Sequence, residues 1–262
     1  MADLVDFTID AHGGLERFNE FAFLTARLRQ GGALWGLKGQ PTVLEEANVR
    51  VDLRREWVSH WPFAPTDHRS EFTPKRVIIE TPAGEVVEQL DQPRDSFAGF
   101  TMETPWTDAQ VAYFAGYTMW TYLTSPFILA RPGVLAEEID PWMENGQTWR
   151  RLRVTFPEDI ATHSTVQTFY IDDAGLLRRH DYDVDIQGSN PAARYLLEPV
   201  EVSGIVLPSK LRIFPRNADN TAAADPLIVS VDLTDYHFEQ STVADDRQGG
   251  VIRPESVITQ QN

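Results

Sequence analysis

The segment LLRRHDYDVDI, residues 176–186, holds three side chains whose types and spacing suit acid–base chemistry. If the segment is a β-strand, alternate side chains share a face, so Arg178, His180 and Tyr182 project together at intervals of about 6.5–7 Å. A cation, a titratable imidazole and a hydroxyl in this order can polarise a carbonyl group and transfer a proton. These three residues are therefore candidate catalytic residues.

The same row of residues also has a purely structural explanation. Its ends, Leu176 and Ile186, are apolar, which is typical of a face that packs into a core. A buried arginine is costly unless it is paired, but Arg178 can extend its charge to water from the strand end, and His180 can bind a backbone carbonyl group. The opposite face is predicted to lie in water, because it carries Leu177, Arg179, Asp181, Asp183 and Asp185.

Composition excludes several kinds of partner. The 262 residues include 23 Lys and Arg against 39 Asp and Glu, which gives a net charge of −16. This charge repels nucleic-acid phosphates and anionic lipid head groups, so we expect neither nucleic acid nor a membrane surface as a partner. No apolar run approaches the roughly 18 residues typical of a transmembrane helix, so we expect no membrane span.

Several cofactor and metal chemistries lack their sequence signals. The chain has no cysteine, which excludes disulfides, thiolate catalysis and cysteine–zinc sites. It also lacks the glycine-rich phosphate-binding motifs, HExxH and GxSxG, so no cofactor is predicted. His60 and His68 flank Asp67, but their spacing is not diagnostic of metal ligands, and we predict no metal site.

Most of the chain is predicted to form strands. Residues 2–18 show apolar side chains at helical spacing, with Gly13-Gly14 as a point of interruption. After them, alternating or β-forming segments predict strands at 22–30, 46–54, 56–61, 67–72, 76–81, 85–90, 148–156, 165–171, 176–186, 194–202, 206–214 and 227–238. We infer one β-rich domain over residues 1–240, followed by a polar C-terminal tail over residues 241–262.

The clearest helix signal lies in the middle of the chain, in WTDAQVAYFAGYTMWTYLTSPF (residues 106–127). Thr107 and Gln110 fit a capping box, and Pro126 ends the helix. Apolar residues occur on both sides of this helix, which is typical of a helix buried inside protein. We therefore predict a curved antiparallel sheet, or half-open barrel, with this helix in its concave face.

Aromatic side chains are the predicted lining of the space between helix and sheet. Trp57 and Trp61 share one face of REWVSHWPF, although a core-facing strand row explains them equally well. Tyr113 and Tyr117 are four residues apart on the central helix, and their hydroxyl groups can bind either a ligand or the backbone. The candidate ligand-binding residues are Trp57, Trp61, Tyr113, Tyr117 and Trp120.

Four features together resemble the LolA-like fold of bacterial lipoprotein carriers: the opening segment DFTIDAHGGLERFNEF, the early meander, the buried central helix and the hairpin TFYIDDAGLLRRHDYDV. The resemblance implies a half-open antiparallel barrel with a pocket for lipid or another apolar molecule. Carriers of this group need an export signal, whereas MADLVDFTIDAHGG has no basic n-region. We therefore expect a cytoplasmic variant rather than a periplasmic lipoprotein shuttle.

Two functions are compatible with these features. The first is a binding protein for a hydrophobic or aromatic small molecule. The second is a cofactor-independent enzyme, such as an isomerase, cyclase or hydrolase, that uses acid–base residues in the same cavity. A uniformly apolar interior favours binding, and converging His, Arg and Tyr side chains favour catalysis. We favour binding because no catalytic motif stands out; the ligand, the reaction and the oligomeric state are left open.

Overall fold

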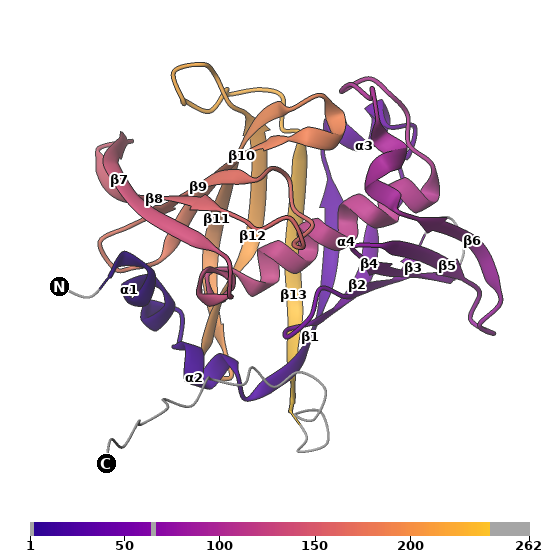
Figure 1. Cartoon of the computed structure of the whole chain (residues 1–262), viewed down its shortest axis with the longest axis horizontal. Helices are drawn as coiled ribbons and strands as arrows, with labels where there is room; N and C mark the ends of the chain where they lie inside the picture. Colours follow the sequence, from indigo (N-terminus) through magenta and orange to yellow (C-terminus); the bar gives the residue numbers. More distant parts are fainter. Residues whose placement is uncertain (1–2, 64–66, 242–262) are drawn as a thin grey trace, which may run out of the picture.

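One antiparallel sheet of thirteen strands dominates the computed structural model, which describes residues 3–63 and 67–241 (Figure 1). The strand order is β6-β5-β4-β3-β2-β1-β13-β12-β11-β10-β9-β8-β7. Pairing of β1 with β13 joins two meanders, β1–β6 and β7–β13, into one curved sheet. The long helix α4 lies across its concave face (Figure 1). The predicted mainly β fold is confirmed; the predicted tail beyond residue 241 lies outside the described residues.

The strands follow the predicted alternation closely. They are β1 (Phe21–Gly31), β2 (Glu46–Asp52), β3 (Val58–Phe63), β4 (His68–Thr73), β5 (Arg76–Glu80), β6 (Val86–Asp91), β7 (Leu135–Glu144), β8 (Gln147–Thr155), β9 (Val166–Ile171), β10 (Leu177–Val184), β11 (Asn190–Val202), β12 (Ile205–Pro215) and β13 (Val229–Gln240). All except β7 overlap a predicted strand. The edge strand β7 is largely exposed on both faces, so its sequence lacks an apolar face that would reveal it.

The helices are few and short apart from α4. They are α1 (Leu4–Ala11), α2 (Leu15–Phe18), α3 (Ala33–Leu37) and α4 (Asp108–Thr124), with 3₁₀ helices η1 (Pro93–Phe97), η2 (Phe127–Ala130) and η3 (Asp185–Gln187). Gly13 and Gly14 separate α1 from α2, and both have positive φ. At Gly13 a Cβ atom would lie 2.0 Å from the carbonyl oxygen of Gly204, so the interruption predicted there requires glycine.

Helix α4 is buried on all sides, as its two apolar stripes predict. Every residue from Ala109 to Thr124 is buried. Its first turn has the predicted capping box, in which the Thr107 hydroxyl accepts from the Gln110 backbone amide and the Gln110 side chain accepts from the Thr107 amide. Within the described ranges, no helix combines the length and apolar character needed to cross a membrane.

Helix α4 packs against β2–β6, which form one half of the sheet. Gly116 allows this close approach: a Cβ atom at that position would lie 2.2 Å from Cγ of Phe72 on β4. The Phe72 ring itself packs against Tyr113 with 5.7 Å between ring centroids. Because the helix packs against this half, a space is left between it and the strands of the other half.

We expect Gly116→Ala to lower the free energy of unfolding by about 1–3 kcal/mol, the usual range for overpacking a close-packed core. The added methyl group meets the buried ring of Phe72, which cannot move away easily. Urea unfolding monitored by circular dichroism measures the change. Gly36→Ala in α3 is the matched control, since its Cβ meets nothing within 4 Å and alanine favours a helix. Equal effects of both changes would contradict this packing.

Candidate ligand-binding site

A cavity of about 350 Å³ lies between α4 and strands β10–β13, where the helix stands away from the sheet. Its wall is mostly apolar and includes Trp35, Phe114, Met119, Ile213 and Val231. At one end the lining reaches the exposed side chains of Leu37, Pro191 and Pro226, which mark the mouth. The predicted room for an apolar ligand between helix and sheet is therefore present in the structure.

Polar side chains interrupt the apolar wall at the buried end of the cavity. Tyr122 of α4 places its hydroxyl 2.8 Å from Nε2 of His163 and 2.7 Å from the hydroxyl of Tyr182 on β10. The rings of His163 and Tyr182 stack with 3.7 Å between centroids. The Tyr117 hydroxyl lies 3.2 Å from Nδ1 of His163. We call Tyr117, Tyr122, His163 and Tyr182 the Tyr–His cluster; all but Tyr117 line the cavity.

The loop between β8 and β9 holds His163 in place. Arg94 donates through Nη1 to the carbonyl oxygen of Thr162 at 2.9 Å, and the Gln167 amide donates to the Thr162 hydroxyl at 2.7 Å. The backbone amide of Asp185 donates to the carbonyl oxygen of His163 at 3.1 Å. These bonds fix the backbone on both sides of the imidazole, so the ring is presented to the cavity in one orientation.

The Tyr–His cluster is electrically neutral. Burial, together with the guanidinium groups of Arg194 and Arg94, lowers the pKa of His163 well below its usual 6.5. Burial also raises the pKa values of Tyr117, Tyr122 and Tyr182 above their usual 10. A neutral imidazole and three phenols carry four protons, whereas three hydrogen bonds join the cluster. One proton is therefore left over, and the tautomer of His163 decides which hydroxyl carries it. When His163 is protonated on Nε2 and Tyr122 donates to Tyr182, the Tyr182 hydroxyl at the cavity is the free donor.

A second buried chain lies beside the Tyr–His cluster and contains His180. The ring donates through Nε2 to Oε1 of Gln167 at 2.6 Å, because Nδ1 must accept from Nη2 of Arg194 at 2.9 Å. Burial and the Arg194 charge lower the pKa of His180 well below 6.5, so this imidazole is neutral too. His180 does not line the cavity. Both of its nitrogens are occupied, Nε2 by Gln167 and Nδ1 by Arg194.

The structure corrects the predicted row of Arg178, His180 and Tyr182. Against β9 the register of β10 shifts between Leu177 and Arg179. This bulge turns Leu177 into the core with His180 and Tyr182, and it sends Arg178 outward. There Nε of Arg178 donates to Oδ2 of Asp172, its acidic partner, at 2.6 Å. Tyr182 reaches the cavity, and Arg178 does not.

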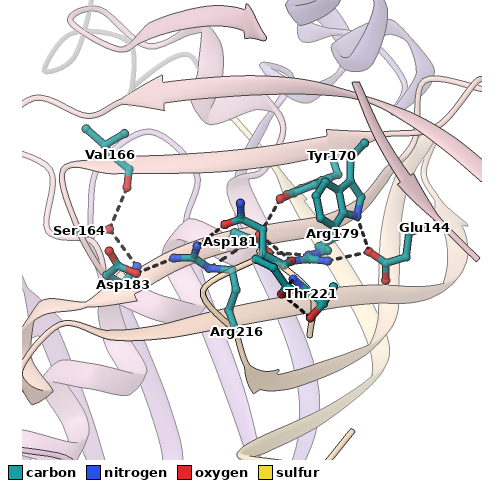
Figure 2. A network of polar contacts seen from close by, with 12 residues as sticks. Glu144, Ser164, Val166, Tyr170, Arg179, Asp181, Asp183, Arg216 and Thr221 are labelled. Atoms are coloured by element: carbon teal, nitrogen blue, oxygen red, sulfur yellow. Dashed lines mark hydrogen bonds and ion pairs between the residues drawn. The ribbon is translucent and has the colours of Figure 1, made fainter. Parts of the chain in front are cut away.

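On the opposite face of β10, predicted to lie in water, Arg179 and Asp181 are buried, whereas Asp183 and Asp185 reach solvent as predicted. Figure 2 shows the polar contacts around Arg179 and Asp181. Arg179 donates through Nε and Nη2 to the two carboxylate oxygens of Asp181 at 2.7 and 2.8 Å, and through Nη1 to Glu144 at 2.6 Å. The Tyr170 hydroxyl donates to Asp181 at 2.7 Å. This part of the face is covered because β7 supplies Glu144 and the loop between β12 and β13 supplies the carbonyl oxygen of Asn220.

The five predicted aromatic ligand-binding residues lie in different surroundings. Trp57 packs edge-on against Phe23, with 6.2 Å between ring centroids, and Trp61 lies beneath the Arg69 guanidinium. Neither tryptophan lines the cavity, because β3 buries Val58 and His60 instead. Tyr113 and Trp120 are buried but also lie off the cavity wall; the Trp120 indole donates to the carbonyl oxygen of Asp52 at 2.9 Å. Only Tyr117 is connected to the site, through His163.

The two histidines considered as metal ligands are far from equivalent. His60 is fully buried and neither ring nitrogen has a hydrogen-bond partner among the described residues, whereas His68 is partly exposed. Burial lowers the pKa of His60 to about 3. Over residues 3–63 and 67–241, no three histidine, aspartate or glutamate side chains are grouped as metal ligands.

Three residues of the candidate site were missed from the sequence: Tyr122, His163 and Arg194. His163 lies in a loop, ATHST, where no periodicity marks its direction. Arg194 lies between Ala192 and Leu196 on one face of β11, so an arginine in an otherwise apolar row marks it in the sequence. That signal was available in NPAARYLLEPV, but the histidine and tyrosine beside Arg178 made the earlier segment more prominent.

The curved open sheet with a long helix in its concave face is the LolA-like fold. No protein-family model matches the sequence, and no curated protein matches it. Among solved structures, a LolA superfamily protein from Nitrosomonas europaea aligns with a TM-score of 0.52 and 8% identity over 92% of this chain and 96% of that one. A DUF1329 family protein from Desulfovibrio piger aligns with a TM-score of 0.51 and 10% identity over 94% and 97%. These similarities establish the fold and confirm the resemblance seen in the sequence.

Proposed function

We propose that the protein binds a hydrophobic small molecule in the cavity between α4 and strands β10–β13. The observation that carries this proposal is the cavity itself: about 350 Å³, mostly apolar, with a few polar groups gathered at its buried end. Binding pockets for small molecules have this construction and a volume of roughly 300–1,000 Å³. The cytoplasmic location predicted from the sequence remains part of the proposal.

A cofactor-independent enzyme is the second candidate, and the Tyr–His cluster is the observation in its favour. His163 contacts two phenols, one of which lines the cavity, so a proton path to a substrate exists in outline. The pKa shifts oppose this function. An efficient acid or base has a pKa near the working pH, but burial moves His163 far below it and the tyrosines far above it. Neutral groups of this kind suit hydrogen bonding to a ligand better than proton transfer.

Filling the cavity tests the binding function. We expect Nile red, an uncharged dye, to bind the native protein and to quench emission from Trp35 in the cavity wall. Ala192→Phe places a ring inside the cavity from β11 and should weaken binding at least about tenfold, or 1.4 kcal/mol. Ala83→Phe, in the exposed turn between β5 and β6, is the matched control and should bind as the wild type does. Dye binding that appears only on partial unfolding would refute the proposal.

Native mass spectrometry of protein purified from its own host separates the two candidate functions. A retained molecule that stays unchanged on incubation supports binding. Conversion of that molecule into a product would favour the enzyme instead.

A further inference from the structure

Arg194 is a buried cation without an acidic partner. Its side chain is 0% exposed, and among residues 3–63 and 67–241 it forms no ion pair. Nη2 donates to His180, but Nε and Nη1 have no hydrogen-bond partner in the described part of the chain. The guanidinium carbon lies 3.6 Å from the ring centroid of Tyr122, a contact that stabilises a cation but does not neutralise it.

Arg179 shows how the same fold treats a buried guanidinium that has a purely structural role. It is equally buried, and its donors are met by Asp181, Glu144 and a backbone carbonyl group. Burial of an unpaired charge costs several kcal/mol, so a cation without an anion is unexpected in a protein core that has no bound ligand. The absence of an acidic partner for Arg194 among the described residues therefore indicates that its counter-charge belongs to a bound molecule.

The position of Arg194 shows where that counter-charge can come from. On β11 it lies two residues from Ala192, and on the neighbouring strand β12 it pairs with Ile213; both of these residues line the cavity. Arg194 thus projects from the cavity side of the sheet, behind Tyr122 and close to Tyr182. The exposed mouth lies at Leu37, Pro191 and Pro226.

We propose that the cavity takes an apolar molecule with a single carboxylate, which enters head first and sets its negative charge against Arg194, Tyr122 and Tyr182. This inference rests on the proposed binding function and names its ligand class. With His163 protonated on Nε2 and Tyr122 donating to Tyr182, the Tyr182 hydroxyl would donate a hydrogen bond to the carboxylate. The positive charge of Arg194, behind Tyr122, would balance the negative charge of the carboxylate. The apolar body would lie along Trp35 and Phe114 toward the mouth.

The electrostatics favour one negative charge rather than two. Arg194 supplies one positive charge, and the two histidines beside it are neutral because burial depresses their pKa values. No lysine or arginine is part of the cavity lining over the described residues. A phosphate dianion would leave a negative charge uncompensated in this setting, whereas a carboxylate would not.

A matched pair of ligands tests the inference. Dodecanoate and 1-dodecanol have the same number of carbon atoms and differ in the charge of the head group at about pH 8. Each is used to displace Nile red from the native protein. We expect dodecanoate to bind at least about tenfold more tightly than dodecanol, which is the scale of a charge-assisted hydrogen bond. Arg194→Met should abolish this preference while leaving dodecanol affinity within about threefold.

Two further variants complete the design. Arg212→Met removes the same charge from β12, but Arg212 is paired with Asp232 and points away from the cavity, so the preference should persist. Tyr182→Phe removes the terminal hydroxyl and should reduce the preference severalfold without touching Arg194. If Arg194→Met does not fold, the wild-type preference and Tyr182→Phe decide the outcome.

The possible failures are distinguishable. Equal displacement of Nile red by dodecanoate and dodecanol would overturn the carboxylate inference and leave the binding function standing. A preference that survives both Arg194→Met and Tyr182→Phe would also overturn it. If Nile red and both lipids fail to bind the native protein, the proposed function itself is wrong.

Discussion

Replacing Arg179 by methionine should lower the free energy of unfolding by about 3–5 kcal/mol, the range for breaking a buried ion pair on one side. Arg179 is the centre of the buried network in Figure 2, where it pairs with Asp181 and Glu144. Its removal leaves the Asp181 carboxylate, which is 4% exposed, with Tyr170 and a distant Arg216 as partners. Urea unfolding monitored by tryptophan fluorescence measures the loss.

The adjacent arginine is the control for this prediction. Arg178→Met removes the same charge one residue earlier, but the Arg178 side chain is 32% exposed and pairs with Asp172 near solvent. We expect it to cost less than about 1 kcal/mol, as for other solvent-accessible ion pairs. Similar losses of unfolding free energy from the two substitutions would show that the buried network around Arg179 contributes no more stability than a solvent-accessible ion pair.

Acid should destabilise the protein through its buried, neutral histidines. Burial lowers the pKa values of His12, His60, His163 and His180 in the folded state, and that of His60 falls from 6.5 to about 3. Between the folded and unfolded pKa values the unfolded state binds more protons, so stability falls as pH falls below about 6.5. At about pH 5, His60 alone should cost about 2 kcal/mol relative to neutral pH.

The contribution of His60 can be isolated by comparing variants. His60→Leu removes a ring whose two nitrogens have no partner among the described residues, so its unfolding free energy should fall about 2 kcal/mol less than that of the wild type between pH 7 and 5. His237→Leu, at an exposed position of β13, is the matched control for replacing a histidine by leucine. Burial raises the pKa values of Glu56 and Asp181, and these groups make the folded state more stable as pH falls. The total pH dependence therefore mixes opposite contributions, and the difference between His60→Leu and wild type isolates that of His60. Parallel pH profiles for His60→Leu and wild type would refute the assignment.

The sheet and the central helix could be predicted because burial leaves a periodic trace in the sequence. Alternation reveals a strand with one buried face, and a helix that is apolar all round reveals a buried helix. β7 could not be found this way, because it has neighbours on one side only and little apolar surface to bury. The short helix α3 follows the pair Gly31-Gly32, which is typical of a turn, and five residues are too few to show a helical period.

The candidate site could be predicted only in part, since one bulge decides which side chains share a face. Alternation placed Tyr182 correctly, but the register shift between β9 and β10 separates it from Arg178. Such a shift depends on the partner strand and has no signature within β10 alone. The burial of Arg179 depends in the same way on β7 and on the loop after β12, which are distant in sequence. His163 and Arg194 become neighbours of Tyr122 only through tertiary packing.

In the part of the chain that the structure describes, the sheet does not close into a barrel, and its edge strands β6 and β7 each pair on one side only. These two edges have consequences for self-association. Both carry exposed apolar side chains: Val86 and Val87 are 58% and 53% exposed, and Leu135 and Met143 are 69% and 65% exposed. An unpaired edge of this kind can add a strand from another molecule. On β7, Pro141 and acidic side chains oppose such addition, and like charges on a chain of net charge −16 repel one another. Because the screening length shrinks from about 10 Å at 0.1 M salt to about 3 Å at 1 M, this protection is weakest in concentrated salt.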